Sequence, residues 1–321
     1  MFENKALLKI IKGNHELKIS HHDIEKVIGS TISEEDAIQL FESIGITIRQ
    51  SGDSYGFRKI DFLNEELIKE KIDQIEDAKN IKLYVEQIIE TTSRYFSEKD
   101  IEKYQYSVCF ADFQTQGRGR GSNQWLSPYG SGICFSVIGS LTSKSSPLGL
   151  SIYCGIAIAR VLRDLGYSCV SLKWPNDLLH DGKKLGGILV ELTSQSQDYY
   201  SFNIGIGINY DLGPDLNSMD QNLFPPTDLL KINHDLAVCR SEMSGILART
   251  VLEALKTFNQ RTMQSSFQLW PDFDALYEKE IKIIQEDNTI KGKNIGIDDT
   301  GALLLDQNGL IKKVYNGHLV I

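Results

Sequence analysis

Between about residue 81 and residue 265, strand-like segments alternate with helical patterns, and this alternation constrains the fold more than any other feature. Five short apolar runs are predicted strands, and two long amphipathic stretches are predicted helices. The predicted strands are 107–113, 133–138, 169–173, 188–192 and 201–208, and the predicted helices are 148–165 and 240–260. Alternation of this kind predicts an α/β domain built on one mixed sheet.

The residues before this domain are organised differently. Three apolar stripes with helical spacing are followed by two strand-like segments around a turn at Gly52. Ser33 followed by Asp36 resembles a capping box at the start of a helix. Three helices followed by a two-stranded ribbon is the order of a winged helix-turn-helix, which we predict for residues 1–62.

The other boundaries follow from changes in pattern. Residues 63–80 are charged and helix-prone, so they form a predicted linker helix, and the α/β domain extends over 81–272. From 273 to 321, short β segments separated by turns predict a small all-β barrel. The predicted fold class is therefore a multidomain α+β or α/β protein.

Composition limits the classes of function. The formal net charge is -9 over 321 residues, so the whole chain is not expected to bind nucleic acid nonspecifically. The five cysteines are odd in number and lack CxxC spacing, which favours reduced thiols over disulfides or a zinc site. No signal-peptide core is present, and no apolar run reaches the ~20 residues that span a bilayer. We expect a cytoplasmic protein.

The first cluster with a chemical role is the run Gly117-Arg118-Gly119-Arg120-Gly121, which follows a predicted strand. Its glycines let the backbone approach a ligand and offer amide donors. Its arginines carry planar cations that suit carboxylates and phosphates. The alternative is a solvated Arg–Gly loop, but such loops are repetitive and lack flanking strands. The pattern favours an anion-binding loop.

Two later clusters strengthen this prediction. Residues 173–177 (KWPND) end a predicted strand, and their rigid Trp-Pro corner places Asn176 and Asp177 at the mouth of the sheet. Lys184 follows and precedes a Gly-Gly step. Residues 205–209 (GIGIN) have a glycine at every second position, which leaves one strand face bare for a flat ligand. The alternatives are an ordinary hairpin with solvated lysines and a tightly packed sheet.

Together these clusters supply cations, backbone donors and a glycine-lined slot. They contain no nucleophile–base pair and no Walker-type phosphate loop. The nearest histidines in sequence, His180 and His234, do not lie in a triad-like context. The predicted chemistry is therefore electrostatic: two anions are held together and a phosphoryl transition state is stabilised.

In order and spacing, these motifs resemble the biotin protein ligases. The resemblance rests on Gln114 and the GRGR run through Trp125, on KWPND, on 184–191 (KLGGILVE) and on GIGIN. The N-terminal unit resembles the bifunctional bacterial branch, in which the ligase is also the biotin-operon repressor. The C-terminal segment resembles the SH3-like barrel of that family. The resemblance covers nearly the whole chain and implies a central domain like that of class II synthetases.

The resemblance implies a two-step reaction. Biotin and ATP form biotinyl-5′-AMP and pyrophosphate, and a lysine of the biotin carboxyl carrier protein of acetyl-CoA carboxylase then displaces AMP. Mg²⁺ would act mostly through the ATP phosphates, with protein ligands unknown. Members of this branch can also form a homodimer through the central sheet, although no residue of this sequence identifies such an interface.

By motif position, the resemblance implies roles for individual residues. Arg118, Arg120, Asp177 and Lys184 would be catalytic, and Asn176 and Asp177 would face the nucleotide, the metal or the incoming lysine. Asn209 would begin the loop that covers the adenine. The implied biotin-binding set is Thr91, Thr92, Ser93, Gln114, Gly117, Arg118, Gly119, Arg120, Lys184, Gly187, Leu189 and Gly205. The implied ATP- and adenylate-binding set is Arg118, Arg120, Trp125, Asn176, Lys184 and Asn209.

Two departures from the family pattern concern the ligand site. The family usually has Ser-Thr-Asn where this chain has Thr91-Thr92-Ser93, so an amide is lost at Ser93. The family often continues GRGR with Arg-Gly, whereas Gly121-Ser122 follows here and removes one positive charge. We expect a competent enzyme with a more mobile loop.

The predicted recognition helix, within 30–45, is acidic. It contains Glu34, Glu35, Asp36 and Glu42 and no Lys or Arg. Over residues 1–60, eight basic and nine acidic residues give a net charge of 8 − 9 = −1. Carboxylates repel DNA phosphates, although they also suit a helix N-terminus. We therefore predict a structural module whose repressor function is weak or lost.

Two other functions remain as alternatives. A lipoate–protein ligase has a related fold and a related adenylation step, but KWPND and the helical N-terminal unit favour biotin. A biotin-responsive transcription factor without ligase activity is opposed by Arg118, Arg120 and Lys184. The sequence does not identify the sequence preference for the carrier.

Overall fold

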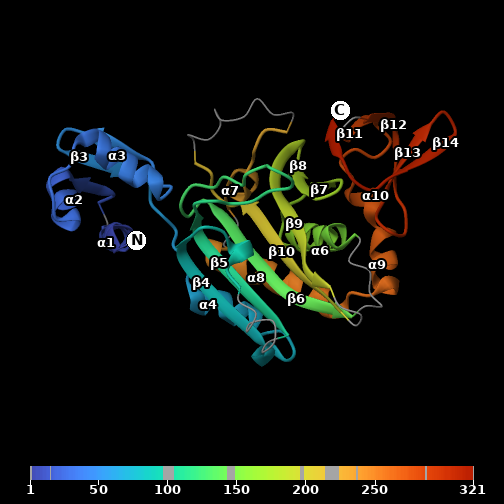
Figure 1. Ribbon diagram of the computed structural model, residues 1–321, viewed down its shortest axis with the longest axis horizontal. Helices are drawn as coiled ribbons and strands as arrows, with labels where there is room; N and C mark the ends of the chain where they lie inside the picture. Colours follow the sequence, from blue (N-terminus) through green and yellow to red (C-terminus); the bar gives the residue numbers. More distant parts are fainter. Residues whose placement is uncertain are drawn as a thin grey trace.

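The computed structural model describes residues 2–14, 16–96, 105–142, 149–195, 199–213, 224–235, 238–285 and 288–320. A central sheet lies in the middle of the molecule, with a small N-terminal unit on one side and a C-terminal unit on the other (Figure 1). Among the described residues, no helix has the length and apolar character needed to cross a membrane.

The N-terminal unit combines three helices with a three-stranded antiparallel sheet. Ser33 caps the third helix, because its side chain accepts a hydrogen bond from the Asp36 amide, as the sequence predicts. Strand β1 is not predicted from the sequence, since three residues show no periodicity. The sheet order is β1-β3-β2. The elements are α1 (Phe2–Gly13), β1 (Lys18–Ser20), α2 (His21–Ile28), α3 (Glu34–Ser43), β2 (Ile48–Ser51) and β3 (Ser54–Phe57).

The central sheet has seven strands in the order β4-β5-β6-β10-β9-β8-β7. Strands β4 and β5 are parallel and the other neighbours are antiparallel, so the predicted mixed sheet is confirmed. Strands β4 and β8 are not predicted from the sequence. The strands are β4 (Ile81–Ile89), β5 (Tyr106–Gln114), β6 (Gly132–Thr142), β7 (Val170–Lys173), β8 (Asp177–His180), β9 (Lys183–Gln195) and β10 (Tyr199–Asn209).

Helices α4 (Glu65–Ile72), α6 (Leu150–Asp164) and α8 (Arg240–Thr257) cover one face of this sheet (Figure 1). The predicted linker helix corresponds to α4, which is shorter than expected and belongs to the core. Ile68 is fully buried, and Gly245 of α8 lets the two helices approach, because a Cβ there would lie 2.8 Å from the Ile68 carbonyl. The opposite face of the sheet is left open for the loops that form the site.

Beyond α8, the described residues form two short helices that lead to a five-stranded antiparallel sheet in the order β14-β13-β12-β11-β15. The indole of Trp174 joins this sheet to the KWPND corner by donating a hydrogen bond to the Gly301 carbonyl at 3.0 Å. The elements are α9 (Gln260–Phe267), α10 (Trp270–Phe273), β11 (Glu280–Gln285), β12 (Asn288–Ile297), β13 (Leu303–Gln307), β14 (Leu310–Val314) and β15 (His318–Val320), with α7 (Leu229–Ile232) preceding α8.

A buried ion pair joins the elements behind the site. Arg240, the first residue of α8, is fully buried, and its Nη1 lies 2.6 Å from Oδ1 of Asp112 on β5. Its Nε also donates to the Gly132 carbonyl at 2.9 Å. Asp112 in turn accepts a hydrogen bond from the Leu63 amide. The pair therefore ties α8, β5, β6 and the chain entering α4 together.

Candidate functional site

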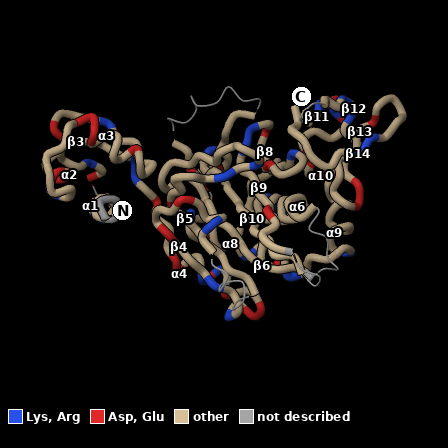
Figure 2. The backbone as a smooth tube through the Cα atoms, viewed as in Figure 1, with Lys and Arg blue, Asp and Glu red and all other residues tan. Residues whose placement is uncertain are grey.

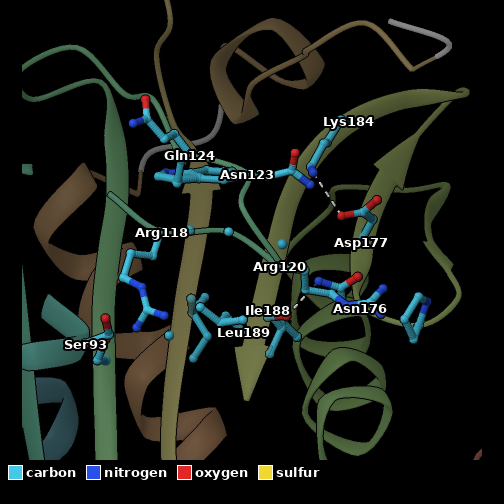
Figure 3. Close-up of a pocket in the computed structure, with 18 of the residues that line it drawn as sticks. Ser93, Arg118, Arg120, Asn123, Gln124, Asn176, Asp177, Lys184, Ile188 and Leu189 are labelled. Atoms are coloured by element: carbon cyan, nitrogen blue, oxygen red, sulfur yellow. Dashed lines mark hydrogen bonds and ion pairs between the residues drawn. The ribbon is translucent and has the colours of Figure 1, made fainter. Parts of the chain in front are cut away.

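A cavity on the open face of the sheet brings most of the predicted site residues together. Of the predicted set, only Gly117 and Asn209 are not part of its lining. The lining residues come from strands β5 to β10, from residues 91–93 after β4, from the Arg–Gly loop and from the C-terminal strand β15. Figure 3 shows part of this lining. The cavity is also lined by residues that are not predicted site residues: Asn123, Gln124, Ser136, Lys173, Trp174, Pro175, Ile188, Ile206, Gly207, His318 and Leu319.

The Arg–Gly loop folds back on itself as a short hairpin over the cavity. The Gly119 amide donates to the Asn123 carbonyl at 2.9 Å, and the Trp125 amide donates to the Gly117 carbonyl at 3.0 Å. Gly121 has a φ of +62°, in the left-handed region that favours glycine. A Cβ on Gly117 would overlap the Trp125 carbonyl. Gly117 therefore shapes the hairpin instead of lining the cavity.

The two arginines of the loop lie in different surroundings. Arg118 forms a bidentate ion pair with Glu191 of β9, with N–O distances of 2.8 and 2.9 Å. Arg120 points toward Asn176 (Figure 3). Burial lowers the pKa of the Arg120 guanidinium, and the charge of Asp177 opposes that shift. Each arginine is therefore already held near a carboxylate that an anionic ligand could replace.

Asp177 joins two lysines from neighbouring strands. Its Oδ1 lies 3.0 Å from Nζ of Lys184, and its Oδ2 lies 2.6 Å from Nζ of Lys173. Burial alone would raise the pKa of Asp177, but the charges and hydrogen bonds of the two lysines hold it below the ordinary value. The cluster therefore has one carboxylate for two ammonium groups, and the excess positive charge suits an anionic ligand.

The backbone of Lys184 is held from behind by a segment distant in sequence. Asn209 is buried, and its Nδ2 donates to the carbonyls of Lys184 at 3.3 Å and Thr227 at 2.9 Å. The Lys184 amide donates to the Pro225 carbonyl at 2.8 Å. Asn209 therefore positions Lys184 and does not itself line the cavity. Residues 214–223 of the loop expected to cover the adenine lie outside the described residues.

The other end of the cavity is lined by hydroxyls and an amide. Gln114 Oε1 accepts from the amide of Thr92 at 2.8 Å and from its hydroxyl at 3.2 Å. The Thr92 hydroxyl also lies 2.7 Å from that of Ser136. Asn203 donates to the Ser93 carbonyl at 2.6 Å. This network fixes a set of donors and acceptors at one end of the cavity.

Some of the overlooked residues had a sequence signal. Lys173 and Glu191 are charged residues at the ends of apolar strand segments. A charged side chain that is buried there needs an oppositely charged partner, because an unpaired buried charge is costly. Ser136 interrupts an apolar strand. His318, by contrast, lies in a three-residue strand that only the folding of the C-terminal unit brings to the cavity.

The fold and the cavity define the ligand-binding domain of a protein ligase, and comparison with known proteins agrees. A sequence profile described as the biotin/lipoate A/B protein ligase family matches residues 84–209, and one described as the biotin protein ligase C-terminal domain matches residues 277–318. The chain is 35% identical over 233 residues to the bifunctional ligase/repressor BirA of Escherichia coli, covering 72% of this chain and 71% of that protein.

Other relatives agree with this match. The bifunctional ligase/repressor BirA of Bacillus subtilis is 33% identical over 225 residues, which is 66% of this chain and 65% of that protein. The solved biotin protein ligase of Aquifex aeolicus, in complex with biotin and ATP, is 25% identical with a TM-score of 0.60, covering 74% of this chain and 97% of that chain. The chain belongs to the biotin protein ligase family, in its bifunctional branch.

Proposed function

We propose that the protein activates biotin with ATP to biotinyl-5′-AMP and transfers the biotinyl group to a lysine of a biotin carboxyl carrier protein. The two-part lining of the cavity carries this proposal. Lys184 and Arg120 supply cations at the Asp177 end, and the network of Gln114 and Thr92 supplies hydrogen-bonding groups at the other end, where Arg118 lies beside Ser93 (Figure 3). Two fused rings with one ureido group and a carboxylate tail, as in biotin, match that distribution.

In the first step, the residues orient the reactants and stabilise charge. A carboxylate oxygen of biotin attacks the α-phosphorus of ATP, and the new O–P bond forms as the bond to pyrophosphate breaks and its electron pair leaves with pyrophosphate. Lys184 exchanges Asp177 for the oxygens of the carboxylate and α-phosphate. Arg118 and Arg120 fold over the same anions. Preorganised cations at developing charge are an efficient form of catalysis.

Mg²⁺ would neutralise negative charge on the ATP phosphates when it is bound. The described residues contain no group of three or more His, Cys, Asp or Glu that could hold a metal ion. Asp177, the carboxylate at the cavity, already has two lysine partners. These residues fit an ion held mostly by phosphate oxygens, with Asn176 and Asp177 as nearby protein oxygens.

In the second step, the acceptor amine attacks the acyl carbon of the adenylate. The N–C bond forms, the C–O bond breaks, and AMP leaves with the electron pair. Asn176 and Asp177 lie at the mouth of the sheet, on the side where the acceptor lysine enters. The partner is the carrier domain of an acetyl-CoA carboxylase.

The remaining site roles extend the same proposal. Leu189, Gly187 and Gly205 line the slot for the biotin rings, and Thr91 and Ser93 line the same cavity. Trp125 and Asn176 lie on the nucleotide side. Asn209 holds the backbone of Lys184, and it stays proposed as an adenylate-binding residue at the start of the loop that covers the adenine.

The experiment that tests the proposal is a carrier-domain biotinylation assay, with biotin-dependent ATP–pyrophosphate exchange as the readout of the first step. Lys184→Ala should abolish exchange while thermal unfolding remains unchanged, because its loss removes the cation at the reacting phosphate. The neighbouring Lys183→Ala is the matched control, since Lys183 is exposed outside the cavity. Near-wild-type exchange by Lys184→Ala would remove the catalytic assignment. Calorimetric titration with biotin and with lipoate distinguishes the two related ligases.

The domain organisation is part of the proposal. Residues 1–62 form a winged helix-turn-helix, 63–80 a connecting segment that contains α4, 81–272 the catalytic domain, and 273–321 an SH3-like barrel. The match of helices and hairpin to the winged-helix order supports the first assignment. The antiparallel five-stranded sheet supports the last.

We propose that the N-terminal unit is a structural module with weak or no operator binding, in contrast to what its relatives' names say of them. The exposed side of α3 carries Glu34, Glu35 and Glu42, and Figure 2 shows acidic residues over this helix. An anisotropy titration on the biotin-operon promoter, with biotinyl-AMP present and near-physiological salt, should show no sequence-specific complex. Glu35→Lys should raise the affinity for DNA of any sequence. Tight, specific binding by the wild type would contradict this assignment.

Homodimerisation through the central sheet is also proposed. Leu192 of β9 and Tyr199 of β10 are 53% and 45% exposed near the ends of neighbouring strands. Sedimentation velocity with and without biotinyl-AMP tests this, and Leu192→Asp should shift the protein toward the monomer if the two exposed side chains lie in the interface.

A further inference from the structure

Lys173 is a second lysine at the reacting end of the cavity, and the two-step reaction assigns it no role. It is the last residue of β7, and its side chain is only 9% exposed. Its Nζ lies 2.6 Å from Oδ2 of Asp177, while Nζ of Lys184 lies 3.0 Å from Oδ1. One carboxylate therefore bridges ammonium groups from two different strands.

The two lysines differ in their freedom to move. The Lys184 side chain is 38% exposed and lies at the open side of the cavity, with its bond to Asp177 drawn in Figure 3. The Lys173 ammonium lies 4.5 Å from the centre of the Phe224 ring and is enclosed by it. Breaking a buried ion pair leaves an uncompensated charge, which is costly. Lys173 is therefore the fixed partner of Asp177, and Lys184 is the exchangeable one.

We infer that Lys173 is a positioning residue that keeps Asp177 in place as a carboxylate when Lys184 leaves it for the anionic ligand. This inference rests on the proposed function, in which Lys184 moves to the phosphate. The vacated Oδ1 then faces the cavity, where the acceptor amine arrives. Without Lys173, the departure of Lys184 would leave Asp177 buried without a bonded cation.

The charges around Asp177 support this division of roles. Lys173 on β7, Lys184 on β9 and Arg120 of the Arg–Gly loop face it. Burial alone raises the pKa of Asp177, whereas Lys184 and Lys173 lower it. Once Lys184 has moved away, Lys173 is the bonded cation that opposes burial. Its removal should therefore let Asp177 take up a proton at a higher pH.

The kinetic test is single-turnover transfer from preformed biotinyl-AMP to the carrier domain between pH 5 and pH 9. Lys173→Met keeps most of the apolar stem and removes the charge. The acid limb of its transfer rate should move upward by about one pH unit or more, with recovery at high pH. Lys173→Arg should retain the wild-type limb, and Ser171→Ala on the same strand serves as the unaffected control. A loss by the same factor at every pH, or no change, would overturn the inference.

A second measurement does not depend on ligase activity. Carboxyl ¹³C NMR of the ligand-free protein reports the pKa of Asp177, and the Asp177→Asn variant identifies its resonance. Lys173→Met should raise that pKa, and Lys173→Arg should leave it low. An unchanged pKa in Lys173→Met overturns the inference whether or not the protein is an active ligase. Absence of biotin-dependent exchange in the wild type would instead overturn the proposed function, so the two failures are distinguishable.

Discussion

The indole of Trp125 lies against Gly207, in the position that a side chain on the central strand β10 would occupy. A Cβ built on Gly207 would overlap three atoms of the indole. The same ring lies 5.9 Å from Nζ of Lys184. The end of the Arg–Gly loop is therefore seated on the bare face of the glycine-rich strand, close to the reacting lysine.

Gly207→Ala should displace Trp125 and with it the loop. Overpacking of this kind costs about 1–3 kcal/mol, so the Kd for biotin is expected to rise by roughly tenfold. Isothermal titration calorimetry measures the change, and Trp fluorescence reports the indole. Gly13→Ala is the control, because nothing lies within 4 Å of a Cβ at that position. Wild-type affinity in Gly207→Ala would show that the contact does not order the loop.

Asn203 should compensate for the amide missing at position 93. It is 1% exposed, and its Nδ2 donates to the Ser93 carbonyl at 2.6 Å. Asn203→Ala should weaken biotin binding by about 1–2 kcal/mol, because a backbone acceptor at the polar end loses its donor. Adding Ser93→Asn should restore part of the affinity in the double variant. Equal affinities of Asn203→Ala and the wild type would contradict this role.

For the buried pair of Arg240 and Asp112, removing one partner should cost more stability than replacing both, because a single buried charge is left without compensation. Arg240→Met leaves the buried carboxyl of Asp112 without its cationic partner, and the free energy of unfolding should fall by about 3–5 kcal/mol. Adding Asp112→Asn removes that charge, and the amide oxygen can still accept from Leu63. The double variant should therefore be more stable than Arg240→Met in urea unfolding. Strict additivity of the two losses would count against a coupled pair.

Asp298 should make the C-terminal unit sensitive to acid. Burial alone would raise its pKa, but hydrogen bonds from Lys313, Thr300 and the Ala302 amide lower it to about 2. Because the folded pKa lies below the unfolded value of about 3.9, the stabilisation is complete above pH ~4 and disappears as the pH falls toward about 2. The difference in Tm between the wild type and Asp298→Asn should shrink over that interval. A difference independent of pH would contradict this assignment.

Much of the fold could be predicted from local patterns. Four of the five predicted strands of the central domain lie within β5, β6, β9 and β10, and the fifth, 169–173, begins one residue before β7. Apolar runs of this kind have a periodicity that is kept in the folded state. The missed strands β1, β8 and β15 are three or four residues long, and such segments become strands only when a neighbour supplies hydrogen bonds. Strand β4 was also missed although it has nine residues, and it is an edge strand that pairs only with β5 in the sheet. The predicted linker helix is instead part of the core, because its apolar residues pack against α8, and this contact is not visible in the local sequence.

The amino-acid sequence by itself determined the chemical inventory of this protein: an Arg–Gly loop, a strand with bare alternate positions, and lysines at strand ends. These features can be predicted from the sequence because they depend only on residue types and their spacing along the chain. Only the tertiary structure decided which charges are partners. Glu191 holds Arg118, Lys173 holds Asp177, and Trp125 covers Gly207. Such pairings join residues on different strands and loops, and their geometry exists only after the sheet has set its register.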